Sequence, residues 1–332
     1  MGPHGSGGTP APLPPPSLPA PPPPTPPPPA PPAGSPPAGP PPWQRIAVGT
    51  PGVEFEARPP GEDAYDVPDT ECDGWSTAEF TLRWASVRGA QHRYYRRPRQ
   101  DAARAVPHGE SGAVAFAVAD GVSSATRAER GAAEACRAAL ERILLQLAWS
   151  PAALDHRDVA GHAAERLHRL ARARLHRADP SPAEVAGLYA TTLVAGLVRP
   201  DRAGPVVELF RIGDSDAWLL DPHRGGYRPL FPSKTGADTL LVSNEVRPLP
   251  SVPDPLEQVT VRLAPGQVLL VGTDGFGDPL GDGDGQVGAL FARQLAAPPS
   301  PLWLAQVLDF SRETFDDDRT LLAVWRRDPA AR

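Results

Sequence analysis

Several aspartates stand at the ends of hydrophobic segments that are typical of buried strands. Asp120 ends the segment AVAFAVA and Asp274 follows QVLLVGT, and each is followed by a glycine. Asp317 and Asp318 come just before TLLAVW, and Asp101 closes the loop after FTLRWASV. Where a strand leaves a sheet the backbone of such an aspartate is fixed, and the following glycine permits a sharp turn or close approach of a ligand.

If these strands are neighbours, their carboxylates converge without matching lysines, because Lys234 is the only lysine in the chain. Carboxylates at such short distances raise one another's pKa. A hard divalent cation such as Mg²⁺ or Mn²⁺ relieves the repulsion. A single Asp-Gly pair is more simply a tight turn. The prediction of a metal site therefore depends on the set, and on the elements that position it.

The elements are expected in segregated runs. Strand-like segments lie at 80–87, 113–119, 190–198, 206–212, 216–220, 259–263, 267–273 and 320–325. Apolar residues at helical spacing predict helices over 125–149 and 158–177, and two more are expected over 286–297 and 302–314. Residues 222–256 are Pro-rich and are interpreted as irregular. The expected order of elements is a run of strands, two helices, a second run of strands, two helices and a last strand. This order indicates an α+β fold with antiparallel sheets rather than alternating βαβ units.

Proline is distributed unevenly along the 332 residues. Residues 1–42 hold 22 of the 46 prolines and contain no Asp, Glu, Lys or Arg. Such a tract cannot bury enough apolar surface to offset the entropy of ordering, so a disordered or polyproline II leader is expected. Residues 43–76 are interpreted as an irregular lead-in with one short strand near 53–57, and residues 77–328 as the domain that carries these aspartates and any catalytic site.

Composition excludes several classes of protein. The net charge of −6 argues against a nucleic-acid-binding domain, and no apolar run is long enough to span a membrane. Two cysteines cannot build a disulfide framework, and no signal peptide is recognised, so a cytoplasmic protein is expected. No Gly-Lys pair exists, which excludes a P-loop.

Six segments, taken in order, resemble the protein phosphatase 2C family of metal-dependent Ser/Thr protein phosphatases, most closely its bacterial variant. They are SVRGAQHRYYRRPRQDA (86–102), AFAVADGVSS (115–124), LYATTLVAGLV (188–198), FRIGDSDAWLL (210–220), LLVGTDGFGDPL (269–280) and DDRTLLAVW (317–325). The resemblance implies a fold of two packed antiparallel sheets flanked by pairs of helices. It also implies hydrolysis of phosphoserine or phosphothreonine in proteins by a water shared between two Mg²⁺ or Mn²⁺ ions.

The resemblance assigns roles by position. Asp120 takes the place of the aspartate that bridges the metals, and Gly121 offers its carbonyl to one ion. Asp274 and Asp317 match the other metal aspartates, with Asp318 in the family's Asn position. Asp101 matches the family's Gln-Asp aspartate, a catalytic-site residue that usually contacts a metal through water or supports the residues that bind it.

Other positions are open or depart from the family. Arg88 or His92 is expected to meet the substrate phosphate or to protonate the leaving oxygen, with His92 the better acid on its ordinary pKa. The loop 122–125 reads Val-Ser-Ser-Ala where the family often has Met-Gly-Gly-His. Val185 occupies the place of an aspartate that binds a third ion, and Glu184 is adjacent but not aligned, so a third ion is uncertain.

Two functions of different classes follow. The first is an active protein phosphatase. The second is a catalytically silent regulatory or phosphoprotein-binding module on the same fold, which the altered loop motivates. The Pro-rich leader, in either case, is a tether or a ligand for a partner that binds Pro-rich motifs.

Overall fold

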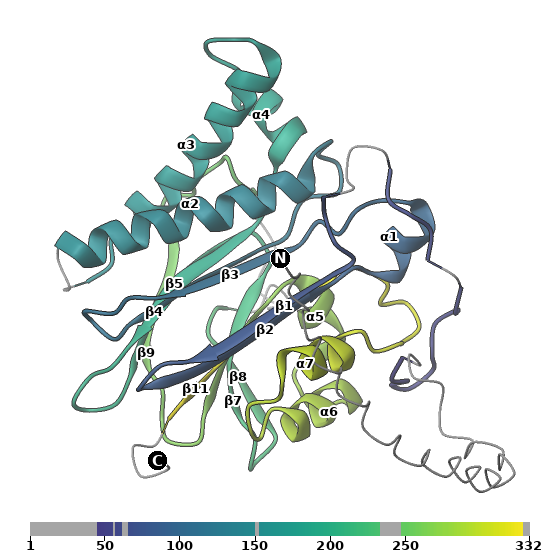
Figure 1. Ribbon diagram of the computed structural model, residues 1–332, viewed down its shortest axis with the longest axis vertical. Helices are drawn as coiled ribbons and strands as arrows, with labels where there is room; N and C mark the ends of the chain where they lie inside the picture. Colours follow the sequence, from purple (N-terminus) through teal and green to yellow (C-terminus); the bar gives the residue numbers. More distant parts are fainter. Residues whose placement is uncertain (1–44, 56, 62–65, 150–152, 233–246, 328–332) are drawn as a thin grey trace, which may run out of the picture. The chain divides into compact units, whose positions relative to one another are not determined.

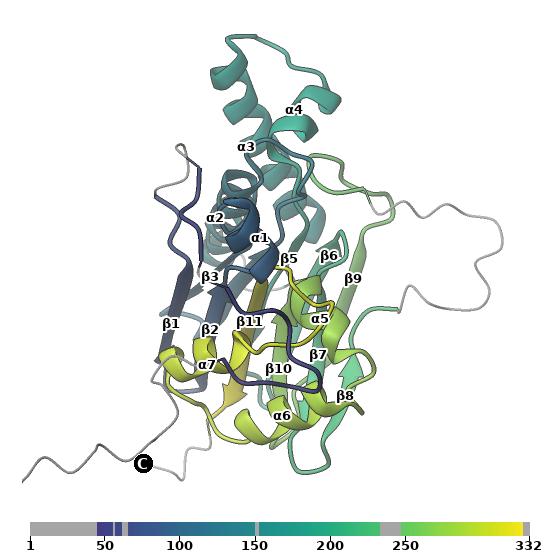
Figure 2. The same ribbon diagram turned by 90° about the vertical axis from the view of Figure 1, so that its right-hand side faces the viewer.

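The computed structural model describes residues 45–327 except 56, 62–65, 150–152 and 233–246. Their strands form two antiparallel sheets (Figure 1, Figure 2). The first has the order β1 (Thr70–Ser76), β2 (Phe80–Val87), β11 (Arg319–Arg326), β10 (Val268–Gly272), β7 (Asp216–Asp221) and β8 (Gly226–Pro229). The second has the order β3 (Ala102–Pro107), β4 (Val114–Ala119), β5 (Leu193–Arg199), β6 (Val206–Ile212) and β9 (Glu257–Arg262). The predicted α+β class with two antiparallel sheets is confirmed.

Helices lie outside both sheets, which gives four layers. They are α1 (Ala90–Tyr95), α2 (Ala128–Trp149), α3 (His156–Leu175), α4 (Pro182–Tyr189), α5 (Asp274–Leu280), α6 (Gln286–Gln294) and α7 (Pro301–Leu308). α2 and α3 share a buried apolar cluster with β3, β4, β5 and β6, whereas α5, α6 and α7 share one with β2, β7, β10 and β11 (Figure 1). None of the described helices is long and apolar enough to cross a membrane.

The sequence of β4 explains how the layers pack. Side chains alternate between the faces of a strand, and in VAFAVA the alanines face α2 while Val114, Phe116 and Val118 face the other sheet. Small residues on β4 meet small residues on α2, including Ala132 and Ala135, so the helix lies close to the sheet. The end of β4, where Asp120 follows, is therefore held between two packed layers.

The structure differs from the sequence prediction in several elements. Residues 70–76 of the expected lead-in form β1, which pairs with β2 along its whole length. No strand forms among the described residues of 53–57, the helix expected over 302–314 ends at Leu308, and the expected irregular stretch 222–256 includes β8. β1 reads TECDGWS, which has little apolar alternation, so its pairing with β2 determines its conformation rather than its own pattern. The leader at 1–42 lies outside the described residues.

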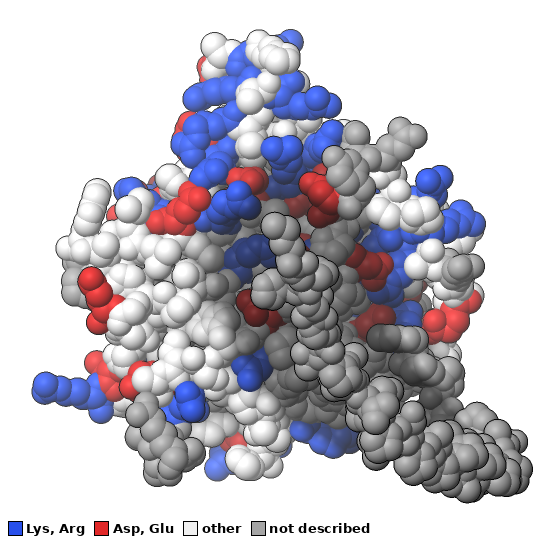
Figure 3. All heavy atoms as spheres, in the orientation of Figure 1, with Lys and Arg blue, Asp and Glu red and all other residues white. Residues whose placement is uncertain are grey.

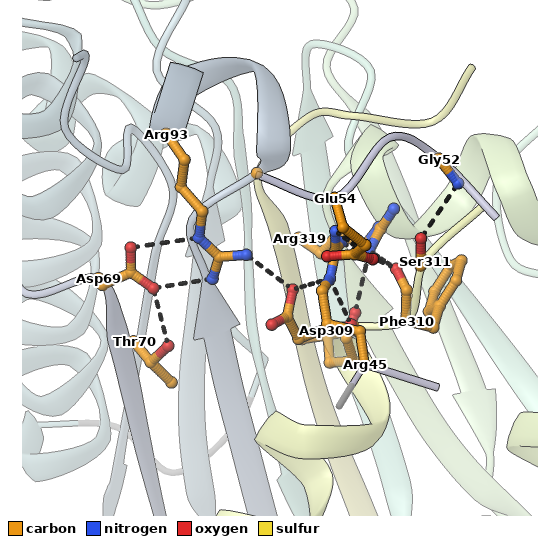
Figure 4. A network of polar contacts seen from close by, with 12 residues as sticks. Arg45, Gly52, Glu54, Asp69, Thr70, Arg93, Asp309, Phe310, Ser311 and Arg319 are labelled. Atoms are coloured by element: carbon orange, nitrogen blue, oxygen red, sulfur yellow. Dashed lines mark hydrogen bonds and ion pairs between the residues drawn. The ribbon is translucent and has the colours of Figure 1, made fainter. Parts of the chain in front are cut away.

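We call residues 45–55 and 57–61 the strap, and its first part runs beside the loop that follows α7 (Figure 4). The amide of Val48 donates to the carbonyl of Ser311 at 3.0 Å, and the amide of Ser311 donates to the carbonyl of Ile46 at 2.8 Å. Arg45 Nε lies 3.1 Å from Asp309 Oδ1. These contacts hold the loop after α7, where the helical pattern was expected to continue, and this loop leads to Asp317.

Candidate metal centre

Asp120 is fixed by the start of the neighbouring strand. The amide of Asp120 donates to Thr192 Oγ1 at 2.9 Å, and the carbonyl of Asp120 accepts from the amide of Thr192 at 2.8 Å. The hydroxyl of Thr191 donates to the same carbonyl at 2.8 Å. The Ala-Thr-Thr block thus sets the backbone from which the Asp120 side chain projects.

The two Asp-Gly pairs allow close backbone packing. A Cβ on Gly121 would lie 2.5 Å from the carbonyl oxygen of Ala128, at the start of α2. A Cβ on Gly275 would lie 1.8 Å from the carbonyl oxygen of Asp318. Both distances are shorter than real Cβ contacts, so glycine is required at each position for the segments to approach.

Asp101 lies where the two sheets meet. It directly precedes β3, and its Oδ2 accepts hydrogen bonds from Thr273 Oγ1 and Thr320 Oγ1, both at 2.8 Å. The amide of Thr320 donates in turn to Thr273 Oγ1 at 3.0 Å. Thr273 lies between the end of β10 and Asp274, and Thr320 lies on β11 after Asp317, so Asp101 anchors both segments that carry the other aspartates.

Asp318 is a functional residue of the site that was not assigned from the sequence. Its Oδ1 accepts from the amide of Gly89 at 2.7 Å, and its Oδ2 accepts from the amide of Gln100 at 2.6 Å. The same Oδ2 lies 2.8 Å from His92 Nδ1. Asp318 therefore joins the segments around α1 to the loop that carries Asp317. Its signals in the sequence were its place beside Asp317 and its match to the family's Asn position.

His92 is brought to the site, but as a buried residue rather than as a surface one. Only 4% of it is exposed, and its ring faces Asp318. Burial lowers the pKa of His92, but the hydrogen bond to Asp318 and the charges of Asp318 and Asp317 outweigh this and raise it. Ligand atoms of His92, Asp317 and Asp318 lie within 4.8 Å of one another.

Arg88 is held away from the pocket between the aspartates. Its Nη2 donates to the carbonyl of His92 at 2.9 Å, and its Nη1 donates to the carbonyl of Arg58 at 3.2 Å and lies 3.7 Å from Asp69 Oδ1. The guanidinium is buried and joins the strap to α1. Arg88 is not among the residues that line the pocket.

The remaining aspartates converge on this pocket, which has a volume of about 170 Å³. Its lining comprises Gln100, Asp120, Gly121, Val122, Ser123, Thr192, Asp214, Asp274 and Asp317. Burial, and then the charges of Asp101 and Asp274, raise the pKa of Asp120 well above its ordinary value. Burial and the charge of Asp317 raise the pKa of Asp274 to about 6, although a hydrogen bond with Asp120 opposes this. Burial and Asp318 raise the pKa of Asp317.

The donor set fits a hard divalent cation. Asp274 Oδ1 is buried and has no hydrogen-bond partner among the described residues, which is costly unless a ligand completes it. Carboxylate and carbonyl oxygens are the ligands that Mg²⁺ and Mn²⁺ prefer. The residues that would hold ions are Asp120, Gly121 through its carbonyl, Asp274 and Asp317.

The residues near the position of a third ion are otherwise engaged. Val185 is fully buried on α4 and offers no oxygen from its side chain. Glu184 forms a capping box with Ser181 at the start of α4 and pairs with Arg177. This capping box also explains α4, which the sequence pattern did not predict although Ser181-Pro-Ala-Glu184 is a recognisable helix start.

Comparison with known proteins places these features in one family. The family model described as protein phosphatase 2C matches residues 88–309. The chain therefore belongs to the protein phosphatase 2C family, as the six segments predicted.

Solved structures of similar proteins have low sequence identity to the chain. RsbX in complex with magnesium is 12% identical, with a TM-score of 0.47 over 77% of this chain and 100% of that chain. The Ser-Thr phosphatase MsPP from Mycobacterium smegmatis is 17% identical, with a TM-score of 0.46 over 73% of this chain and 97% of that chain. The catalytic domain of the phosphatase PstP with two manganese ions is 17% identical, with a TM-score of 0.47 over 75% of this chain and 99% of that chain. No curated protein matches the sequence.

Proposed function

We propose that the protein hydrolyses phosphoserine or phosphothreonine in other proteins and requires Mg²⁺ or Mn²⁺. The observation that carries the proposal is the convergence of Asp120, Asp274 and Asp317 on one pocket, where Asp274 Oδ1 is left without a partner. Family membership supports the reaction class. Phosphorylated proteins are then the substrates.

The chain's own residues bind the metal ions and position the groups that react. Asp120, Asp274, Asp317 and the carbonyl of Gly121 would hold two ions. Ions held by these residues would supply a water of lowered pKa as the nucleophile and would neutralise charge on the phosphoryl oxygens. Asp101 keeps the ends of β10 and β11 together through Thr273 and Thr320, as its hydrogen bonds indicate, and so sets the separation of the aspartates.

His92 is the proposed proton donor to the leaving oxygen. Its Nδ1 is oriented by Asp318, which leaves Nε2 as the other ring nitrogen for this role. His92 lines a hollow of about 280 Å³ with Gln91, Tyr95 and Arg97. We assign Arg88 the role of a positioning residue, because its hydrogen bonds hold α1 and with it His92.

The test is phosphate release from a phosphothreonine peptide by the full chain, with Mn²⁺ and with EDTA. We expect turnover only with Mn²⁺, and its loss in Asp120→Ala with an unchanged circular dichroism spectrum. Absence of turnover under both conditions would refute the proposal. Calorimetric binding of Mn²⁺ without turnover would favour the alternative of a silent phosphoprotein-binding module, for which the altered loop 122–125 remains the motivation.

A further inference from the structure

A second and larger cavity adjoins the pocket lined by Asp120, Asp274 and Asp317, which we call the metal pocket. It has a volume of about 650 Å³ and lies between the segment after α1 and the loop that leads into α2. We call it the arginine groove, because Arg96, Arg97 and Arg127 line it. Figure 3 shows that basic side chains gather over α1. The chain as a whole carries a net charge of −6, so this groove is a local exception.

The arginine groove is continuous with the metal pocket. Gln100 and Ser123 line both cavities. The backbone of Gln100 is fixed, since its amide donates to Asp318 Oδ2 at 2.6 Å and its carbonyl accepts from Gly121 at 3.2 Å. Its side-chain Oε1 is buried and has no hydrogen-bond partner among the described residues. A polar group with unused capacity therefore stands where the two cavities meet.

Arg96 and Arg97 are anchored but keep donors for a ligand. Arg97 Nη1 donates to the carbonyl of Ser123 and Arg96 Nε donates to the carbonyl of Pro59, each at 3.3 Å. Both side chains are exposed, and a guanidinium has five N–H donors, so one such bond leaves the others. Among the described residues that line the groove, Glu129 is the one acid, and burial raises its pKa.

We propose that the arginine groove binds Asp and Glu side chains of the substrate polypeptide close to the phosphorylated residue, and so selects acidic phosphorylation sites. This inference rests on the proposed function for the position of the phosphate. Charge complementarity carries it, because planar guanidinium groups bind carboxylates by paired hydrogen bonds. A chain whose phosphorylated residue enters the metal pocket passes Gln100 and Ser123 to reach the arginines.

The experiment uses the full chain with Mn²⁺ and phosphothreonine peptides that differ only in flanking residues. One series carries Asp and Glu on the N-terminal side, another carries them on the C-terminal side, and matched series carry Asn and Gln. We expect KM for one acidic series to be about tenfold lower than for its neutral match, which is the size of one charge-assisted hydrogen bond. Equal KM values for all series would overturn the inference while leaving the proposed function intact.

Two variants tie the preference to the groove. Arg127→Gln removes one charge. Arg96→Gly removes another at a position with φ of 61°, which glycine adopts readily, so a disrupted α1 cannot account for its effect. Each should reduce the ratio of KM values several-fold. The control is Arg174→Gln, in the exposed basic surface over α3 (Figure 3), which should keep the ratio. A ratio that is unchanged in both groove variants would overturn the inference.

Binding separates this inference from the proposed function. The Asp274→Asn chain is titrated with fluorescent acidic and neutral phosphopeptides, and anisotropy is measured. Tighter binding of the acidic peptide, reduced by Arg127→Gln, would support the role of the arginine groove even if the wild-type chain shows no turnover. Absence of turnover would refute only the proposed function. Equal binding of both peptides, or displacement of the acidic peptide by a short single-stranded oligonucleotide at equal concentration, would overturn the inference.

Discussion

Two clusters of charged residues lie near each other in the fold and show opposite electrostatics. The carboxylate cluster, defined as Asp101, Asp120, Asp274 and Asp317, extends from the buried Asp101 to the exposed Asp317, and the pKa values of its members are raised. The second, which we call the arginine–aspartate network, is formed by Arg45, Asp69, Arg93 and Asp309 (Figure 4).

In the arginine–aspartate network every charge has an opposite neighbour. Arg93 binds both oxygens of Asp69, at 3.3 and 2.8 Å, and its Nη1 lies 3.0 Å from Asp309 Oδ1. Burial opposes the charge of Arg93, but these carboxylates raise its pKa further. Such a network is charge-compensated by itself, whereas the carboxylate cluster, under the proposed function, requires a cation. The predictions below test this contrast.

The largest expected effect is in the carboxylate cluster. In Asp274→Asn, Mn²⁺-dependent phosphate release should fall about 1000-fold, because metal-ion stabilisation of the transition state is worth several kcal/mol. The melting temperature without metal should not fall, since the change removes one of several like charges. The exposed Asp282→Asn, in the turn after α5, is the matched control and should retain turnover. Turnover retained by Asp274→Asn would contradict the assignment.

Metal binding should be visible as stability. At about 100 times its dissociation constant, Mn²⁺ adds roughly 2.7 kcal/mol to the free energy of unfolding. Calorimetry should therefore show a higher melting temperature with Mn²⁺, reversed by EDTA. Asp309→Asn should show the same rise and Asp274→Asn a reduced one. An equal rise in both variants would place the ion outside the carboxylate cluster.

The network should respond in the opposite way. Asp309→Asn weakens the contacts of Arg93 and Arg45 and leaves part of a buried guanidinium unpaired, so the free energy of unfolding should fall by about 1–2 kcal/mol. Urea denaturation measures the loss. Turnover with Mn²⁺ should persist. A variant as stable as the wild type would show that the network contributes little.

The smallest expected effect on stability concerns Glu71, an acid whose charge is compensated by two arginines. Glu71 of β1 accepts from Arg99 at 2.6 Å and from Arg104 of β3 at 3.2 Å. Burial raises its pKa, but the charges of the two arginines outweigh this and lower it below the ordinary value of 4.5. Because the folded pKa is the lower one, the stabilisation is present above the unfolded pKa and is lost as pH falls through the folded pKa.

In Glu71→Gln the free energy of unfolding at pH 7 should therefore be lower by at most about 1 kcal/mol. The difference from the wild type should shrink as pH falls below the ordinary pKa of 4.5 and vanish once pH is below the lowered folded pKa, where Glu71 is protonated in the folded and the unfolded chain. Urea denaturation over a series of falling pH values measures it. A difference that does not shrink as pH falls would mean that the side chain acts through packing and not through charge.

The sequence alone was sufficient for the elements with strong local patterns. The apolar alternation of β4 and the long stripe of α2 are properties of consecutive residues, so they were predictable together with the fold class and the aspartates at the strand ends. The order of six segments was enough to predict the family. Short elements such as α1 and β1 were not predictable, because pairing and packing with distant segments stabilise them.

Only the tertiary structure decided which charges face one another. Asp317 and Asp318 are adjacent in sequence, yet one lines the metal pocket and the other receives two backbone amides and His92. Arg88 and Arg97 belong to the same segment, yet one is buried behind α1 and the other lines the groove. Sequence determines which charged groups exist, but burial and distance, which set their pKa and their partners, arise only when remote segments are packed together.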